Sequence, residues 1–448
     1  MNKNECYDIS IDDLTVDGNG IGRVEGMAVF TPNILPGETG TVKIIKIAKN
    51  YAIGRVEKFT QKSEERVIPA CKCYKFCGGC SLQHLSYDGQ LWAKWKHVQN
   101  CIKKIGGIKT EVLFPLASDN EYHYRNKTAF PVGTGEDGRI QIGCYQRHSH
   151  KIVDTDTCLL QDDNMDKVIG CIRNFLMENK VQPYNEETGK GLVRHLIVRK
   201  TAPGEIMVAL VINGERIPHE EKLIAAVTSE IANVTSIVIN ENKNSGNVIL
   251  GRKTKAVFGR DRIREKILNV EYDISVNSFL QVNHDQTEKL YAKVLELAAV
   301  KPQETVLDLY CGAGAISLQL AGAAKKVYGI EIIPQAIEDA EANAKLNHIG
   351  NVEFVLGDCS EKLPQMGDIL NHTDVIVVDP PRKGLEKNTI DVILASSAKR
   401  LVYVSCDPAT LARDLKQLSE GFEVKTIQPV DMFPQTMHVE TVVLMSRD

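Results

Sequence analysis

The chain has 448 residues, of which 43% are hydrophobic and 25% charged, and its formal net charge at pH 7 is −4. These proportions are ordinary for globular proteins, allow two to four domains, and exclude a uniformly basic polyanion-binding protein. No apolar run reaches the roughly 18 residues of a membrane span and no signal peptide is recognisable, so we expect a cytoplasmic protein without a membrane partner.

Residues 1–65 contain short alternating segments separated by glycines, a pattern that predicts a small, OB-like β-barrel. Basic residues are concentrated in and just after this region. Between residues 40 and 110 there are 14 Lys/Arg against 4 Asp/Glu, and Tyr51 lies among them. Such a surface can bind RNA phosphates, although the same residues could equally form a solvated basic face.

Twelve cysteines without a signal peptide favour metal or catalytic roles over disulfide bonds. Cys71, Cys77 and Cys80 are closely spaced, and two glycines separate the last pair. Cys158 is the candidate for a fourth ligand, and Cys73 competes for one position. Four thiolates suit either a [4Fe-4S] cluster or zinc, so we predict a metal site here.

Residues 66–265 mix short β patterns with occasional helices and predict an α+β central domain. Within it, residues 86–105 carry apolar side chains at helical spacing. From residue 266 to 448, helices and strands alternate strictly, as they do in a Rossmann-like parallel sheet.

The first strand of that sheet, residues 305–309, is followed by a glycine turn with the spacing Asp-x-x-x-Gly-x-Gly. Ser317 stands where the dinucleotide fingerprint has its third glycine, and the shorter spacing is typical of S-adenosylmethionine enzymes. The second strand ends in Glu331, which could accept both ribose hydroxyls. The third ends in Asp358, which could accept the adenine amine, and either acid could instead cap a helix.

The fourth strand ends in Asp379, followed by two prolines and Arg382. Amino methyltransferases carry a similar Asp-Pro-Pro and then an aromatic residue that stacks on the base. Because Arg382 replaces that aromatic, transfer to an exocyclic amine is less favoured. Asp379 could face either the imide of a uracil or the methionine end of the cofactor.

The fifth strand ends at Cys406, and the last strand begins at Glu440. A thiolate that adds to C6 of uracil makes C5 nucleophilic, and a base must then remove the C5 proton. Cys406 could serve as the nucleophile and Glu440 as the base, with His438 as a rival base. A lone cysteine is more often buried packing, but a cofactor-binding sheet beside it favours catalysis.

Three segments resemble the RNA (uracil-5-)-methyltransferases, in particular the branch with a TRAM barrel and an iron-sulfur cluster. They are residues 405–415 (SCDPATLARDL), 431–440 (DMFPQTMHVE) and 279–283 (FLQVN). The resemblance covers nearly the whole chain. It implies a barrel at 1–65, a central iron-sulfur domain at 66–265 and a methyltransferase domain at 266–448, with the 86–118 segment packed on the last.

The same resemblance implies a role for individual residues. Cys406 is the expected nucleophile and Glu440 the expected base. The expected cofactor residues are Gln281, Tyr310, Glu331, Asp379 and, more weakly, Asp358. The expected ligands of a [4Fe-4S] cluster are Cys71, Cys77, Cys80 and Cys158, which leaves Cys73 as an extra thiol.

The resemblance also bears on the substrate. The transfer-RNA branch is taken to lack both the barrel and the cluster, so the expected partner is 23S ribosomal RNA, bound by a monomer. The alternatives are 5-methyluridine formation in transfer RNA and a non-catalytic iron-sulfur protein that binds RNA.

Overall fold

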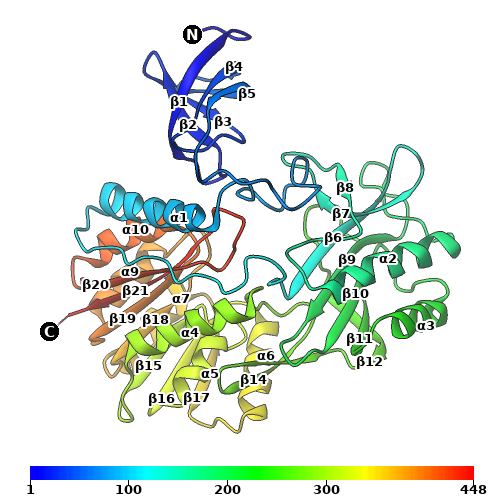
Figure 1. The fold of residues 1–448 in the computed structure, drawn as a ribbon. Helices are drawn as coiled ribbons and strands as arrows, with labels where there is room; N and C mark the ends of the chain where they lie inside the picture. Colours follow the sequence, from blue (N-terminus) through cyan, green and yellow to red (C-terminus); the bar gives the residue numbers. More distant parts are fainter. Residues whose placement is uncertain (448) are drawn as a thin grey trace.

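The computed structural model describes residues 1–447 and contains a closed barrel, two seven-stranded sheets and a two-stranded hairpin (Figure 1). The barrel stands apart at one end of the molecule, and the two large sheets lie side by side beneath it. In the part of the chain described here, no helix is both long and apolar enough to cross a membrane.

The barrel confirms the expectation for the amino-terminal region. Its strands follow the order β1-β2-β3-β5-β4. They are β1 (Cys6–Leu14), β2 (Gly20–Val24), β3 (Met27–Thr31), β4 (Thr39–Ile47) and β5 (Tyr51–Gln61). Alternate residues such as Ile9, Val29 and Val42 fill the interior. Gly22 is required where two strands approach closely, because a Cβ there would lie 2.2 Å from Ile9 Cγ2.

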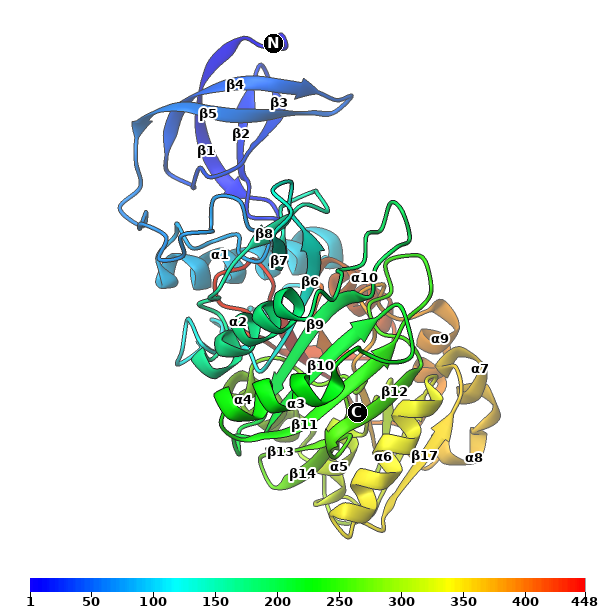
Figure 2. The same cartoon turned by 90° about the vertical axis from the view of Figure 1, so that its right-hand side faces the viewer.

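The central sheet has the order β12-β11-β10-β9-β6-β7-β8. Its strands are β6 (Lys127–Thr134), β7 (Ile140–Tyr145), β8 (Ile152–Asp154), β9 (Val193–Lys200), β10 (Ile206–Ile212), β11 (Val234–Glu241) and β12 (Lys253–Gly259). Helices α2 (Asp163–Glu178) and α3 (Glu220–Glu230) cover one face (Figure 2). Along β9, Leu196 and Val198 pack toward these helices. Ile197 points the other way, into a core shared with residues of the carboxyl-terminal sheet.

The carboxyl-terminal sheet has the order β17-β16-β15-β18-β19-β21-β20. Its strands are β15 (Thr305–Leu309), β16 (Lys326–Glu331), β17 (Val352–Leu356), β18 (Val375–Val378), β19 (Arg400–Ser405), β20 (Glu423–Val430) and β21 (Glu440–Ser446). The pairings from β17 to β19 are parallel, and β21 runs antiparallel to both of its neighbours. This is the expected Rossmann-like methyltransferase fold with one reversed strand.

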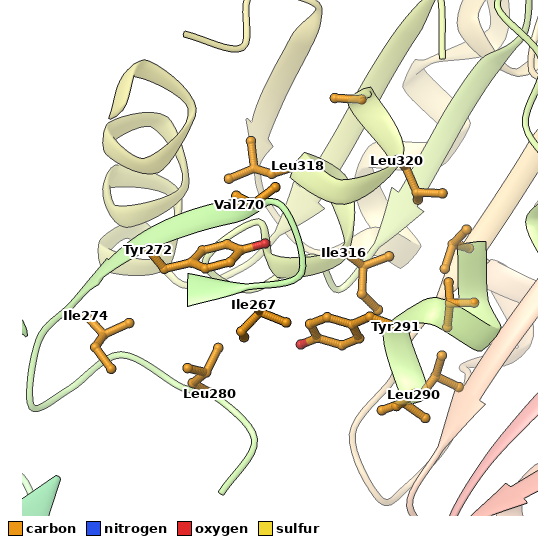
Figure 3. Packing of buried hydrophobic residues seen from close by; sticks show 14 of the residues in the cluster. Ile267, Val270, Tyr272, Ile274, Leu280, Leu290, Tyr291, Ile316, Leu318 and Leu320 are labelled. Atoms are coloured by element: carbon orange, nitrogen blue, oxygen red, sulfur yellow. The ribbon is translucent and has the colours of Figure 1, made fainter. Parts of the chain in front are cut away.

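Helices flank this sheet on both sides. They are α4 (His284–Ala298), α5 (Ala315–Ala321), α6 (Pro334–Leu346), α7 (Cys359–Lys362), α8 (Gly367–Leu370), α9 (Lys387–Ala395) and α10 (Pro408–Leu418). The hairpin of β13 (Ile263–Ile267) and β14 (Val270–Ile274) packs against α5 and α4 (Figure 3). Tyr272 fixes that contact, because its hydroxyl donates to the Ala315 carbonyl at 2.9 Å.

Helix α1 (Tyr87–Cys101) lies on the carboxyl-terminal sheet although it precedes the central sheet in the chain (Figure 1). Its end continues into a π-helical turn (Ile102–Gly106). Val98, Cys101 and Ile102 share a core with residues of β19 and α10. The segment that follows runs beside β20, where Val112 pairs with Ile427 and Leu116 with Val430. Residues 86–118 therefore buttress the edge of the sheet that carries β20 and β21.

Candidate active site

A large cleft lies where the barrel, the cysteine-rich segment and both large sheets meet. Its volume is about 3140 Å³. Phe30 and Tyr51 line it from the barrel, Arg147 from the turn between β7 and β8, and His195 from β9. The carboxyl ends of β15, β18 and β19 form its floor. All of the catalytic and cofactor residues expected from the sequence line this cleft. The cleft is therefore the candidate active site.

The pairing of β19 with β21 brings Cys406 and Glu440 close together. Ser405, the last residue of β19, pairs with Thr441 in antiparallel register, so Cys406 follows and Glu440 precedes that pair at the same end of the two strands. The charge of Glu440 raises the pKa of the Cys406 thiol, which agrees with this proximity. Cys406 is half-buried and Glu440 is 3% exposed. His438, the rival base, is exposed and touches the edge of the Phe433 ring.

Burial raises the pKa of the Cys406 thiol and of the two carboxyl groups near it. Burial raises the pKa of Glu440 to about 8, with a further contribution from the charge of Asp379 and an opposing one from Arg382. Burial alone raises the pKa of Asp379 to about 7. Burial and then the two carboxylates raise the pKa of Cys406 to about 11, whereas Arg382 hydrogen-bonds the thiol and lowers it. The resting site therefore holds a neutral thiol.

This arrangement is suited to moving a proton between a sulfur and a carboxylate. A carboxyl group with a pKa near 7 or 8 gives up or accepts a proton easily around neutral pH. The guanidinium of Arg382 stabilises a thiolate once it forms, because opposite charges favour the ionised state. The site thus holds a potential nucleophile, a potential base and a nearby cation.

The other end of the cleft is built from the turn after β15. Tyr310, Gly312 and Gly314 have φ angles of 63°, 55° and 77°, so the chain doubles back sharply. A Cβ on Gly314 would lie 3.0 Å from the Phe354 ring, which explains that glycine. Glu331 stabilises the turn, because its carboxylate accepts Gly312 N at 3.1 Å and Ile333 N at 2.9 Å.

The residues of this turn fit an adenosyl group. Glu331 is 8% exposed and lines the cleft, where it can also accept hydroxyl groups. Asp308 is buried beneath the turn and accepts Ser317 Oγ at 2.5 Å, while no donor within residues 1–447 reaches its other oxygen, Oδ1. A carboxylate oxygen that is buried and unpaired is costly, and a bound donor would satisfy it.

Gln281 and Asp358 flank the same end of the cleft. Gln281 is 8% exposed and reaches the cleft from the segment before α4. Asp358 caps α7, since its Oδ1 accepts Ser360 N at 2.8 Å. The helix-cap interpretation of Asp358 is therefore confirmed, and Asp358 also lines the cleft.

The predicted metal ligands gather in one place. Cys71, Cys80 and Cys158 surround the buried rings of Tyr74 and Tyr124. The charge of Cys158 and that of Cys77 both raise the pKa of Cys80, which shows that these sulfurs are close. Within residues 1–447, however, no three or more His, Cys, Asp or Glu side chains are arranged as a ready-made metal site.

The donors around these thiols have the right chemistry for a thiolate cluster. Gly79 N donates to Cys77 Sγ at 3.3 Å, and Gln83 Nε2 donates to Cys80 Sγ at 3.2 Å. Amide hydrogen bonds of this kind are found around thiolates that bind clusters. The thiols thus fit a cluster by chemistry, although their positions are not those of bound ligands.

Two residues of the site were not identified from the sequence. Cys144, on β7, hydrogen-bonds Cys77 and is the main reason that the pKa of Cys77 falls to about 6. It is remote in sequence from the other cysteines, so no spacing motif marks it. Arg382 was noted only as a replacement for an aromatic residue, and its contact with Cys406 depends on the packing of two strands.

Comparisons with known proteins agree with this geometry. The family model described as tRNA (uracil-5-)-methyltransferase matches residues 86–448, and the TRAM domain model matches residues 2–56. An uncharacterized RNA methyltransferase of Listeria innocua is 46% identical over 448 residues, covering 100% of this chain and 98% of that protein. Another, from Halalkalibacterium halodurans, is 46% identical and covers 99% and 98%.

A solved structure matches almost the whole chain. It is the Pyrococcus abyssi tRNA (uracil-54, C5)-methyltransferase in complex with S-adenosyl-L-homocysteine. It superposes with a TM-score of 0.79 at 29% identity, over 98% of this chain and 100% of that one. The shared span therefore extends over the barrel, the central sheet and the catalytic sheet.

Proposed function

The chain belongs to the tRNA (uracil-5-)-methyltransferase family and is an S-adenosylmethionine-dependent RNA (uracil-5-)-methyltransferase, and we propose that Cys406 and Glu440 carry out its chemistry. The observation that carries the proposal is the antiparallel register of β19 and β21, which sets the thiol beside the carboxyl group. A pyrimidine ring that contacts both side chains would present C6 to the sulfur and the C5 proton to the carboxylate.

The proposed reaction has three steps. The Cys406 thiol gives its proton to water in the cleft and its sulfur adds to C6 of the uracil, which breaks the C5–C6 double bond and leaves an enolate with electron density at C5. C5 takes the methyl group of S-adenosylmethionine, which becomes S-adenosylhomocysteine. The Glu440 carboxylate then removes the proton from C5, the C5–C6 double bond re-forms, and the thiolate leaves.

Arg382 and Asp379 support this sequence. Arg382 hydrogen-bonds the thiol and stabilises its anion during attack and departure. Asp379 lies at the end of β18 in the same cleft. Its raised pKa allows it to be protonated or ionised near pH 7, so it can meet either the imide of the base or the positive end of the cofactor.

Gln281, Tyr310, Glu331 and, more weakly, Asp358 are proposed to hold S-adenosylmethionine at the other end of the cleft. Glu331 would bind the ribose hydroxyls through the lone pairs that its two backbone contacts leave free. Tyr310 lies at the turn itself, where a ligand must pass close to the backbone.

The size of the cleft supports a substrate larger than one nucleoside. Small-molecule sites have volumes of roughly 300–1,000 Å³, and this cleft is about 3140 Å³. On the barrel wall, the rings of Phe30 and Tyr51 stack with centroids 5.2 Å apart, and Tyr51 is 37% exposed. An exposed ring is a stacking platform for an unpaired base. The target uridine would be flipped from its stack to reach Cys406.

Two classes of RNA are candidate substrates. We expected 23S ribosomal RNA on the premise that transfer-RNA enzymes lack both the barrel and the cluster. The part of that premise that concerns the barrel is wrong, because the Pyrococcus transfer-RNA enzyme matches 98% of this chain, barrel included. We retain 23S ribosomal RNA as one candidate substrate, and that likeness favours transfer RNA as the second. Mapping 5-methyluridine in both RNAs, from cells with and without the gene, decides between them.

The proposed chemistry is tested with RNA containing 5-fluorouridine. Fluorine at C5 cannot leave as a proton, so after methyl transfer the sulfur–C6 bond should persist and give a protein–RNA complex that survives denaturation. Wild-type enzyme should form it and Cys406→Ala should not. If Cys406→Ala forms the complex as efficiently as wild type, the nucleophile is a different residue.

We also propose that Cys71, Cys77, Cys80 and Cys158 hold a [4Fe-4S] cluster. When bound, such a cluster would tie the loop after the barrel to the segment before α2, and no electron transfer is required of it. The amides on Cys77 and Cys80 support this assignment. Anaerobic reconstitution followed by iron analysis and Mössbauer spectroscopy tests it, and zinc in place of iron would contradict it.

A further inference from the structure

Residues 431–439 form the loop that delivers Glu440. They connect β20 to β21, and the two ends of the loop meet because Val430 pairs with Glu440. Any movement of the loop therefore acts directly on the residue proposed as the base. A hairpin loop of this length is flexible unless other parts of the chain restrain it.

Five successive carbonyl groups of this loop are held by donors from outside the hairpin. Gln286 Nε2 binds Asp431 O at 2.9 Å, Asn283 Nδ2 binds Met432 O at 3.2 Å, Lys94 Nζ binds Phe433 O at 3.0 Å, Tyr124 OH binds Pro434 O at 2.9 Å, and Ser81 N and Leu82 N bind Gln435 O at 2.9 Å. The donors come from the start of α4, from α1, from the segment after the cysteines and from the segment before β6. The loop is thus held by four separate parts of the chain.

Lys94 is the charged member of this set. Its side chain is 0% exposed and ion-paired with Asp431, which is also 0% exposed. Tyr87 donates to the second oxygen of Asp431 at 2.9 Å. A lysine is almost never buried completely without a specific partner. Here both partners of the ammonium group, Asp431 and the Phe433 carbonyl, belong to the loop.

A short chain of hydrogen bonds leads from Lys94 to the base. The Phe433 carbonyl that Lys94 binds also accepts Thr436 Oγ1 at 2.9 Å. Thr436 Oγ1 in turn accepts His438 N at 3.2 Å, two residues before Glu440. Between them, Gln435 adopts a φ of 71°, a conformation that a non-glycine residue keeps only when its surroundings impose it.

We propose that Lys94 and Tyr124 are positioning residues for Glu440, which hold the 431–439 loop so that its carboxylate reaches the C5 proton. The inference rests on the proposed function of Glu440. It goes beyond that function because neither residue lines the cleft or touches a reacting atom. Both act through consecutive carbonyls of the loop.

The removal of the C5 proton distinguishes misplacement of Glu440 from a general loss of folded enzyme. Loss of the base should stop the reaction after methyl transfer, with the RNA still bonded to Cys406. The transferred methyl group carries tritium from S-adenosyl-[methyl-³H]methionine. The tritium that stays with the denatured protein therefore counts only the covalent complexes in which methyl transfer has already occurred. The RNA is total RNA from cells that lack the enzyme, and Glu440→Gln serves as the reference.

We expect Lys94→Met to turn over about tenfold more slowly than wild type. We also expect at least five times more labelled complex. Both quantities are divided by the amount of enzyme that binds S-adenosylhomocysteine, which counts the folded molecules. Misplacing a catalytic group by about 1 Å costs up to 100-fold. Tyr124→Phe should shift the same ratio in the same direction by a smaller factor. Lys104→Met, an exposed lysine on the turn after α1 and outside the cleft, is the matched control and should behave as wild type.

A second variant guards against misfolding of Lys94→Met. Lys94→Met with Asp431→Asn removes both buried charges together, which is tolerated better than leaving one of them unpaired. The ratio of complex to turnover does not depend on the folded fraction. If the folded variants and Tyr124→Phe keep the wild-type ratio while Glu440→Gln accumulates complex, the positioning inference is refuted. If Glu440→Gln itself accumulates none, the assignment of the base fails instead.

Discussion

Replacing Glu440 with glutamine should stabilise the catalytic domain, and the gain should grow with pH. In the folded protein, burial and the neighbouring Asp379 raise the pKa of Glu440 from 4.5 to about 8. In the unfolded chain the same carboxyl group titrates near its ordinary value of about 4.3. Between these two pH values the folded state binds the extra proton, so stability falls as pH rises.

The size of the effect follows from this window. Each pH unit inside it costs up to about 1.4 kcal/mol. Between pH 5.5 and 7.5, Glu440 alone should therefore remove roughly 2.5 kcal/mol of stability, and less if water in the cleft solvates its carboxylate. Glutamine does not titrate, so the advantage of Glu440→Gln over wild type should increase by the same amount across this interval. For a domain of this size that corresponds to about 5–10 °C in the unfolding midpoint.

Thermal unfolding at pH 5.5 and 7.5 measures the difference. Because a protein of several domains need not unfold in one step, the relevant transition is the one that S-adenosylhomocysteine shifts upward. Glu187→Gln replaces an exposed glutamate that does not line the cleft and controls for the loss of one charge. If Glu440→Gln changes the midpoint equally at both pH values, the carboxyl group has no raised pKa and the electrostatic reasoning for the site is wrong.

Four further variants test other parts of the site. Arg382→Gln should slow complex formation with 5-fluorouridine RNA about tenfold at pH 7.5 and recover as pH rises, because Arg382 lowers the pKa of Cys406; a pH-independent defect would contradict this. Tyr51→Ala should weaken RNA binding about 5- to 150-fold by filter binding while S-adenosylhomocysteine affinity stays constant, since a stacked base contributes about 1–3 kcal/mol. Glu331→Gln should lower the affinity for S-adenosylhomocysteine about tenfold in calorimetry and leave the affinity for RNA unchanged. Cys80→Ser should lower bound iron and its visible absorbance, and full retention of iron would remove Cys80 from the ligand set.

The sequence predicted the parts of the fold in which the spacing of hydrophobic residues distinguishes a helix from a strand. Alternating helices and strands after residue 266 gave the parallel sheet, and glycine-broken alternation gave the barrel. The direction of β21 could not be deduced, because a buried apolar strand has the same composition whether it runs parallel or antiparallel. The helix in 86–105 was expected from its spacing, yet Ile105 is 43% exposed. The chain there leaves the α-helix for a π-helical turn, which rotates the residues that follow.

The site residues fall into two groups, those that the order of the strands predicts and those that only tertiary contacts reveal. Cys406, Glu331 and Asp379 stand at strand ends, so chain order alone sends them to one edge of the sheet. Lys94 reads in the sequence as part of the polar face of an amphipathic helix. Only the tertiary contact with Asp431 reveals that it is buried. Charge partners that are remote in sequence leave no periodic signal, which is why Lys94 and Cys144 were missed.

The reversed strand links these observations. In a parallel sheet every strand presents its carboxyl end at the ligand-binding edge, where the chain leaves the sheet. The first residue of a strand can lie beside a nucleophile at this edge only if that strand runs in the opposite direction. β21 does so, and its first residue is Glu440. That solution places Glu440 beside Cys406, but it makes the position of the base depend on an irregular loop. The buried Lys94–Asp431 pair and the row of held carbonyls stabilise that loop, so the reversal of one strand accounts for both the catalytic pair and the charged pair behind it.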